Sequence, residues 1–396
     1  MIIGGTGTFH CLAPRIATRW HGQAGLWYEL YTPTASSESA EHGRVDVRIV
    51  VTGAHGFIGT AVRSALLRRH DEVLTLGLGG QPGGPRYDGR IDNVYEVEAM
   101  AAWLADRRPD GVLHLAGTRS EVSSTLMSEL NTCFAASLME ALVLGRLDRV
   151  PILLIGSAAE YGHVSSPAPL TEQSPAHPRS HYGQTKLAQT QLGLAAAQRG
   201  QPVVAARVFN VLGRGMPSYL SLPSFAGQLR DIAAGRTEAV LRTGPLSAVR
   251  DFLPVTVVAE VLADLIRLPA AYGQLVNVCG GRPYLMRDIV NRMIGLSGIA
   301  VTLHEMEGES GADIAYGDPS RLKGLLRSAG FGPLRNADIA EVMEDSGCPV
   351  AGTDGNRTLL PTWKPQAPRH RACRTADIPA AGSPVHAHTV SPPAEN

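Results

Sequence analysis

The sequence predicts an α/β fold: a doubly wound parallel sheet with a smaller mixed α/β lobe on its C-terminal side. Between residues 46 and 210, short apolar runs such as Ile49–Val51 are rich in β-branched residues and indicate strands buried on both faces. Helical patterns such as 97–107 alternate with them at the spacing of right-handed strand–helix–strand units, which build parallel sheets. We expect 46–210 to be mainly the first domain, and 211–345 to be mainly the smaller lobe, interleaved with it.

The composition excludes several classes of protein. The 396 residues include 36 lysines and arginines and 36 aspartates and glutamates, so the formal net charge is zero. The sequence therefore lacks the excess of positive charge that is typical of proteins that bind nucleic acid. The five cysteines are scattered without a CxxC pair, which argues against disulfides and zinc and favours a reducing compartment. No apolar run reaches the ~18 residues that cross a bilayer, and no signal-peptide pattern opens the chain. We expect a cytoplasmic protein that binds neither membrane nor metal.

The two ends of the chain differ from the rest. Residues 1–44 open with MIIGGTGTF, a glycine-rich start, but no helical periodicity follows that would offer a helix end to a phosphate. From about Gly347, proline, glycine, serine, threonine and histidine dominate and apolar periodicity ends. We expect an extension outside the fold at 1–44, and disorder both there and in the tail 347–396.

A glycine-punctuated turn follows the first strand, in the string TGAHGFIG. Gly53 would make the tight turn, Gly56 would let backbone N–H groups approach a pyrophosphate, and Gly59 would let the next helix (61–69) lie close to the strand. The N-terminus of that helix would present unpaired N–H groups and a partial positive charge to the phosphates. Strand, turn and helix together predict a dinucleotide-binding unit.

The sequence leaves the choice between NAD and NADP open. A unit that prefers NAD usually carries Asp or Glu at the end of the second strand, about 20 residues beyond the first glycine, to hold the ribose hydroxyls. Here the second strand (72–76) runs into Gly77, with neither an acidic residue nor an adjacent arginine for a 2′-phosphate. Arg63, Arg69 and Arg86 are alternative candidates, and nothing in the sequence selects among them.

Three residues further along the chain form a candidate catalytic group. The strand at 150–155 delivers Ser157 to the carboxyl edge of the sheet, where parallel sheets place their active sites. Tyr182 and Lys186 are four residues apart on a predicted helix, hence on one face. The reference pKa of a tyrosine phenol is ~10, too high for proton transfer near neutrality, and a nearby lysine ammonium would lower it. Ser157 would hydrogen-bond the reacting oxygen of the substrate.

In this order, the glycine turn, the serine and the Tyr-x-x-x-Lys pair resemble the extended short-chain dehydrogenase/reductases of the NAD-dependent epimerase/dehydratase type, over roughly residues 46–345. Ser157, Tyr182 and Lys186 match the catalytic triad of that family. The resemblance implies a Rossmann domain, NAD or NADP as cofactor and a nucleotide sugar as substrate. It also implies a homodimer formed through the helix at 121–144, whose apolar stripe is otherwise typical of core.

The resemblance also implies roles for residues outside the triad. Asn131 matches a mid-helix residue with a structural and proton-relay role, and Asn210, in RVFNVLGRGMP, matches one that contacts substrate. Arg250 matches an arginine that pairs with the substrate diphosphate; the alternative is a surface salt bridge with Asp251. Asp92, after a short third strand, is a candidate for contact with the adenine. The cofactor contacts fall on Gly53, Gly56, Phe57, Ile58, Gly59, Ala116, Gly117, Tyr182 and Lys186.

The residues beside Ser157 narrow the reaction. In sugar 4,6-dehydratases of this family, acidic or hydrogen-bonding residues follow the serine or threonine; here Ala158 and Ala159 follow, which cannot transfer protons. The string GSAAEYG looks more like the GDP-4-keto-6-deoxymannose reductases. We therefore expect reduction of a 4-keto-6-deoxy sugar nucleotide, with a proton from Tyr182. One alternative is a 4-epimerase with tightly bound NAD. Another is an NADP-binding protein without turnover, although the presence of both Tyr182 and Lys186 argues against it.

Overall fold

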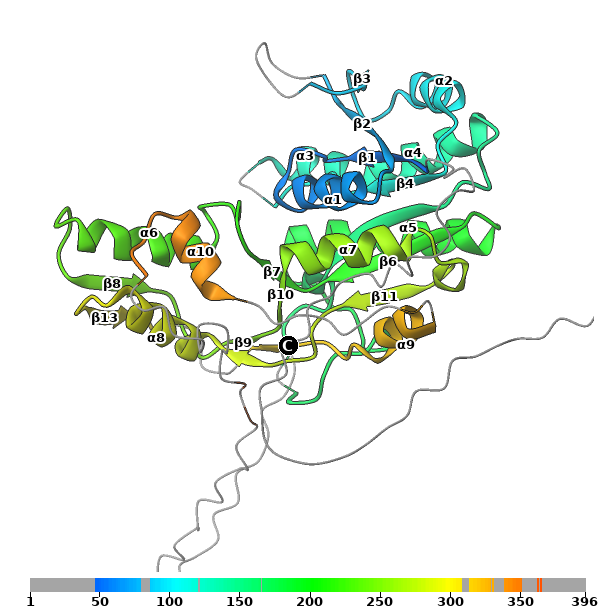
Figure 1. Cartoon of the computed structure of the whole chain (residues 1–396). Helices are drawn as coiled ribbons and strands as arrows, with labels where there is room; N and C mark the ends of the chain where they lie inside the picture. The colour runs from blue at the N-terminus through cyan, green and yellow to red at the C-terminus, as the bar shows by residue number, and fades with distance from the viewer. Residues whose placement is uncertain are drawn as a thin grey trace, which may run out of the picture.

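The central sheet is parallel and has seven strands, in the spatial order β11-β6-β5-β4-β1-β2-β3 (Figure 1). The structure is a computed structural model, and it describes residues 47–79, 86–119, 122–164, 166–307, 313–328, 330, 338–350, 362 and 364. The strands of this sheet are β1 (Arg48–Thr52), β2 (Glu72–Leu78), β3 (Gly89–Ile91), β4 (Gly111–His114), β5 (Ile152–Ser157), β6 (Val203–Val208) and β11 (Leu275–Val278). The strand order reverses between β1 and β4, where parallel sheets of this kind bind ligands. The predicted Rossmann-type fold is confirmed.

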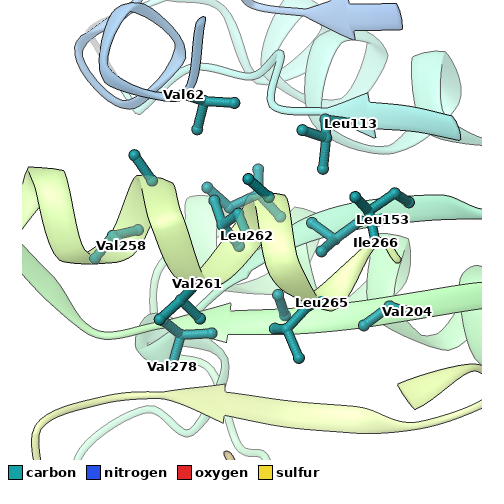
Figure 2. Packing of buried hydrophobic residues seen from close by; sticks show 14 of the residues in the cluster. Val62, Leu113, Leu153, Val204, Val258, Val261, Leu262, Leu265, Ile266 and Val278 are labelled. Carbon is teal, nitrogen blue, oxygen red and sulfur yellow. The ribbon is translucent and has the colours of Figure 1, made fainter. Parts of the chain in front are cut away.

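Helices cover both faces of the sheet. The helices of the first face are α1 (Phe57–Arg68), α7 (Val255–Leu265) and α9 (Ser320–Ser328), and those of the second are α2 (Val97–Arg107), α4 (Phe134–Leu144) and α5 (His181–Gln198). Ile49 and Val51 point to the first core and Val50 to the second, as the alternation of a strand requires. Figure 2 shows Val62 of α1 and Leu262 of α7 in the first of these clusters.

The smaller lobe has its own core beyond the carboxyl edge of the sheet. Its helices are α6 (Ser221–Ala233), α8 (Met286–Ser297) and α10 (Ile339–Asp345). Its short strands form three small sheets, which are β7 (Asn210–Leu212) with β10 (Phe252–Pro254), β8 (Val240–Thr243) with β13 (Thr302–Glu305), and β9 (Val249–Arg250) between β12 (Tyr284–Leu285) and β14 (Ile314–Ala315). Leu212, Phe225 and Met343 are buried in the lobe core.

Along the chain, segments of the smaller lobe alternate with segments that belong to the central sheet and its helices. After the first pieces of the lobe, the chain returns to the sheet with α7, a short 3₁₀ turn (Pro269–Ala271) and β11, which pairs in parallel with β6. It then returns a second time with α9, whose Leu322 and Leu326 pack into the core that α1 and α7 share. The β-branched and apolar residues of β11 explain its place, because they are buried on both faces of the sheet.

Two helices differ from the sequence expectation. The first helix begins at Phe57 rather than Ala61, so Gly59 lies inside its first turn and the turn glycines lead directly into the helix. The helix expected at 121–144 consists of α3 (Ser124–Ser128), a π-helical turn (Glu129–Cys133) and α4. Its stripe is largely core: Phe134, Leu138 and Leu142 are buried, whereas Leu126 is 40% exposed.

Two expectations concern the ends of the chain. The predicted extension at 1–44 lies outside the described residues, as does most of the tail from 347. Cys348 and Val350, at the start of that tail, still pack against the core of the lobe. Within the described part of the chain, no helix combines the length and the apolar character needed to cross a membrane.

Candidate active site

The turn after β1 is closely packed and leaves no room for a side chain at Gly53 or Gly59, as a phosphate cradle requires. Gly53 has a φ of +65°, and a Cβ atom there would lie 2.6 Å from the backbone nitrogen of Ala116. A Cβ atom at Gly59 would overlap the carbonyl oxygen of Gly53. Gly56 precedes α1, and no described side chain caps its first turn, which also holds no acidic residue. The N–H groups and partial positive charge of this turn therefore fit the pyrophosphate of a dinucleotide.

The cradle makes Gly59→Ala a sharp test. We expect cofactor affinity to fall about tenfold or more, about 1.4 kcal/mol, because the added Cβ atom would displace the Gly53 carbonyl group and distort the turn that faces the phosphates. Gly227→Ala in α6 is the matched control, since a Cβ atom there has no neighbour within 4 Å. Calorimetric titration of both variants with NADH and NADPH measures the effect. Equal affinities in the two variants would contradict the cradle.

Residues 77–79, which end β2 and begin the next loop, carry no carboxylate of their own, as the sequence indicated. Gly77 packs against the ring of Tyr87, which a side chain at position 77 would overlap. Asp92 lies close by, because a Cβ atom at Gly79 would be 3.1 Å from its Oδ1 atom. The structure thus brings the predicted adenine-side residue to the end of β2.

The three arginines considered for a 2′-phosphate are not equivalent. The guanidinium group of Arg69 binds the carboxylates of Glu260 and Asp264 on α7, so it is committed to packing α1 against α7. Arg63 and Arg86 remain as candidates.

The end of β4 joins the glycine turn to the catalytic helix. The backbone N–H of Ala116 donates to Thr52 Oγ1 at 3.2 Å. At Gly117, a Cβ atom would lie 3.2 Å from Lys186 Nζ and 2.7 Å from Asn131 Oδ1. Ala116 and Gly117 therefore stand between the cradle and Lys186; the cofactor contacts that the family resemblance implies for them stay predictions.

Asn131 lies in the π-helical turn and holds this junction together. Its amide nitrogen donates to the carbonyl oxygen of Thr118 at 2.8 Å and to Thr185 Oγ1 at 3.0 Å, and its Oδ1 accepts the N–H of Thr118 at 2.7 Å. The side chain thus ties the loop after β4 to α5. Its predicted structural role has a geometric basis, while its proton-relay role stays a prediction.

His114 is a neutral residue buried in β4. Its Nδ1 atom lies 2.9 Å from Thr52 Oγ1, and its Nε2 atom has no hydrogen-bond partner among the described residues. Burial lowers its pKa to about 3, with a smaller contribution from the charge of Lys186.

Ser157 ends β5 and caps a single 3₁₀ turn (Ala158–Glu160). The Ala159 N–H donates to Ser157 Oγ at 3.2 Å, and the Ser157 N–H donates to Glu160 Oε1 at 2.8 Å. The other carboxylate oxygen of Glu160 binds Arg207, and the Glu160 side chain is fully buried. Glu160 therefore points back into the protein, and no acidic residue follows Ser157 into the site.

Tyr182 and Ser157 meet at this edge of the sheet. Burial raises the pKa of the Tyr182 phenol, whereas a hydrogen bond with Ser157 and the charge of Arg119 lower it. The Arg119 guanidinium lies 5.7 Å from the centroid of the Tyr182 ring, a cation–π distance. Lys186 was predicted to lower this pKa, but the groups that lower it in the structure are Ser157 and Arg119.

Lys186 is buried one turn beyond Tyr182. Its ammonium group donates to the carbonyl oxygen of Ile155 at 2.9 Å and to Gln189 Oε1 at 3.0 Å. Gln189 closes a triangle by donating to the same carbonyl at 2.9 Å. Burial lowers the pKa of Lys186 to about 8, and the charge of Glu160 partly opposes this. The ammonium is thus held beside Gly117.

Known proteins are similar to this chain in both sequence and fold. A family model described as "NAD dependent epimerase/dehydratase family" matches residues 49–279, which contain both the cradle and the triad. The chain belongs to the NAD-dependent epimerase/dehydratase family. The predicted family is confirmed, and with it the expectation of a nicotinamide dinucleotide cofactor.

Three similar proteins illustrate the range of the family. A dTDP-6-deoxy-L-talose 4-dehydrogenase (NAD(P)(+)) from Kitasatospora kifunensis is 30% identical over 270 residues, covering 67% of this chain and 83% of that protein. A UDP-glucose 4-epimerase from Neisseria meningitidis serogroup C is 26% identical over 338 residues, covering 76% and 96%. The structure of RMD from Pseudomonas aeruginosa complexed with NADPH aligns with a TM-score of 0.65 at 24% identity, covering 76% and 98%. The last likeness shows the shared fold.

Two residues assigned to substrate by the family resemblance have protein partners. Asn210 donates from its side chain to the backbone carbonyl of Asp251 at 3.0 Å, where β7 pairs with β10. Arg250 forms its salt bridge with Asp313. The alternative of a salt bridge between Arg250 and Asp251 is wrong, because the buried Asp251 carboxylate accepts N–H groups from Gly280 and its neighbours. The substrate contacts of Asn210 and Arg250 stay predictions.

Sequence reasoning missed several groups at this site. Gln189 was within reach, because it follows Lys186 by three residues and so shares its helix face. Arg119 carried no signal, since it lies in the loop after β4 and its approach to Tyr182 depends on the packing of α5. Arg207 was hidden in an apolar strand, β6, where it lies opposite Gly156 in the register with β5.

Proposed function

We propose that this protein reduces a 4-keto-6-deoxy sugar nucleotide, with Tyr182 as the proton donor. The observation that carries the proposal is the arrangement at the carboxyl edge of the sheet: the start of α5, with Tyr182, packs on the turn that Ser157 caps, Ser157 lowers the pKa of the Tyr182 phenol, and Lys186 lies beside Gly117. Burial raises the pKa of Tyr182, which keeps the phenol protonated near neutrality, and a protonated phenol is what a reduction requires. The relative from Kitasatospora, named as a 4-dehydrogenase of a 6-deoxy sugar nucleotide, supports redox chemistry at C4.

The residues divide the work as follows. A bound NADH or NADPH supplies the hydride for the carbonyl carbon. Ser157 donates a hydrogen bond to the carbonyl oxygen and stabilises the charge that develops there, and Tyr182 delivers the proton that completes the hydroxyl group. Lys186 would hold the nicotinamide ribose. Ala158 and Ala159 offer no acid or base for eliminating water, so dehydration is not part of the proposal.

A 4-epimerase is the second candidate. The Neisseria relative is a UDP-glucose 4-epimerase and aligns over nearly all of its length, which favours this alternative. Both reactions use the same triad, so stoichiometry separates them. In a spectrophotometric assay with a panel of 4-keto sugar nucleotides, a reductase consumes one reduced cofactor per product. Product formation without any change in nicotinamide absorbance would overturn the reductase and support the epimerase.

We propose that Arg250 binds the diphosphate of the substrate by exchanging its partner Asp313 for phosphate oxygens. Arg250→Gln should then raise KM about tenfold or more with a smaller effect on kcat, since hydrogen bonds to charged groups contribute about 1.5–3 kcal/mol. Asp313→Asn, which frees the guanidinium from its salt bridge, should lower KM. Steady-state kinetics of both variants measures this. If KM stays unchanged in both while thermal stability falls, the pair is structural only.

The assembly and the cofactor preference belong to the same proposal. We propose a homodimer through the face that α3 and α5 share, where Leu126 and Leu192 are each 40% exposed. The absence of a carboxylate at Gly77 is compatible with NADP as well as NAD.

A further inference from the structure

A buried ion pair lies directly behind Ser157, and the proposed reaction does not use it. Glu160 Oε2 lies 2.6 Å from Arg207 Nε, and the two side chains are 0% and 4% exposed. The Arg207 guanidinium also lies 4.6 Å from the centroid of the Tyr161 ring. Two charges are therefore held out of water between the end of β5 and the middle of the sheet.

Stability alone does not account for this pair. Removing two charges from water is unfavourable, and well-packed apolar residues of the same volume often stabilise a protein as much or more. Burial raises the pKa of Glu160, and the charge of Arg207 opposes that rise. The buried pair therefore stabilises the fold no more than apolar residues of the same volume would, and its geometry indicates a different role.

The contacts of Glu160 lead to the catalytic serine. Its second oxygen accepts the Ser157 N–H at 2.8 Å, while Ser157 Oγ accepts the Ala159 N–H at 3.2 Å, which together make a capping box. A Cβ atom at residue 156 would lie 2.5 Å from Glu160 Oε1. Gly156 therefore leaves room for the carboxylate beside the serine backbone.

This arrangement fixes the direction of the serine hydroxyl group. Because Oγ accepts from the Ala159 N–H, its own proton points to another acceptor. The first turn of α5, which carries Tyr182, packs on this 3₁₀ turn, because a Cβ atom at Gly183 would lie 2.5 Å from the carbonyl oxygen of Ala159, and Ser157 lowers the pKa of the Tyr182 phenol. The hydroxyl group therefore keeps its proton available for an acceptor other than the Ala159 backbone.

We propose that Glu160, held in place by Arg207, positions Ser157 so that its hydroxyl group donates to the reacting oxygen. Glu160 is a positioning residue, because it touches the serine backbone and not the substrate. The inference rests on the proposed function, in which Ser157 binds the carbonyl oxygen, but its geometric part can be tested without turnover.

Two double variants isolate the contact. Both carry Arg207→Met, so that no charge is left unpaired; one adds Glu160→Gln and the other Glu160→Leu. Only the first retains an oxygen that can accept the Ser157 N–H. We expect kcat of the Leu variant to be at least about tenfold below that of the Gln variant, since misplacement of a catalytic group by about 1 Å can cost 10²-fold. Cofactor affinity and melting temperature should match in the two variants.

The ionisation of Tyr182 gives a readout that needs no substrate. Its pKa is measured from the ultraviolet difference spectrum between each double variant and the same variant with Tyr182→Phe. Arg119, Tyr219 and Glu160 are the charged or titratable groups that act on Tyr182 from other elements; the first two are common to both variants, and both variants lack the third. Lys186, on the same helix, is also common to both. We expect a higher Tyr182 pKa in the Leu variant, because the serine no longer donates to it reliably.

The outcomes separate the two proposals. A wild-type protein that converts no 4-keto sugar nucleotide overturns the proposed function, while a higher Tyr182 pKa in the Leu variant still supports the positioning role. Equal kcat values and equal Tyr182 pKa values in the two double variants overturn the positioning role, even if the wild type is an active reductase.

Discussion

The Tyr182→Phe variant is expected to lose about 10²- to 10⁴-fold in kcat, the range that a positioned acid or base contributes. The change removes the proton donor and leaves the ring in place, so cofactor affinity should stay within about twofold of wild type, a difference of roughly 0.4 kcal/mol. Steady-state turnover of a 4-keto sugar nucleotide, together with calorimetric titration of NADH and NADPH, measures both quantities.

The matched control is Tyr272→Phe. That phenol donates to the carbonyl oxygen of Ile266 at 3.1 Å, behind the sheet, so its loss also removes one tyrosine hydroxyl group but leaves the site intact. A Tyr182→Phe variant that retains turnover comparable with this control would show that the proton comes from another group.

The Lys186→Met variant is expected to be inactive and yet more stable than the wild type. Burial lowers the pKa of Lys186 from 10.5 to about 8, a difference that corresponds to about 3 kcal/mol at about 1.4 kcal/mol per pH unit. Methionine removes this penalty but also removes the hydrogen bonds to Ile155 and Gln189, each worth about 1 kcal/mol. We therefore expect a net gain of about 1 kcal/mol near neutral pH, measured by chemical unfolding.

The pH dependence of that gain has a defined sign. Between about pH 8 and 10.5, Lys186 is deprotonated in the folded state while the unfolded chain still binds the proton, so the wild type gains stability as pH rises. The advantage of Lys186→Met should be complete below about pH 8 and shrink toward pH 10.5. Lys323→Met, at an exposed position of α9, is the control and should be nearly neutral. A Lys186→Met variant less stable than wild type at pH 7 would contradict the account.

Most of the fold could be predicted from local pattern. Strands such as β1 and β6 are short apolar runs and helices such as α2 have clear boundaries, so periodicity is sufficient to place them. The predicted start of α1 was four residues too late, because neither Gly56 nor Phe57–Gly59 offers a capping side chain that would mark the true start. The helix begins directly after the glycine turn. The π-helical turn around Asn131 has no local sequence signal, and the partner of Asn131 there, Thr185 on α5, is distant in sequence.

For the site as well, local features could be predicted from the sequence and long-range contacts could not. Ser157, Tyr182 and Lys186 could be found because their order and spacing carry the chemistry. The partners that tune them are distant in sequence: Arg207 is 47 residues from Glu160, and Asp313 is 63 from Arg250. Such pairs depend on strand register and on how the lobe packs against the sheet, and neither can be predicted from the local sequence.

The most direct test of the account follows the hydride itself. The protein is incubated with reduced nicotinamide dinucleotide deuterated at the transferable position and with a 4-keto-6-deoxy sugar nucleotide, and the product is analysed by mass spectrometry and proton NMR. The account predicts one deuterium at C4 of the sugar and one oxidised cofactor for each product molecule. A product without deuterium at C4, or one formed while the reduced cofactor persists, would contradict it.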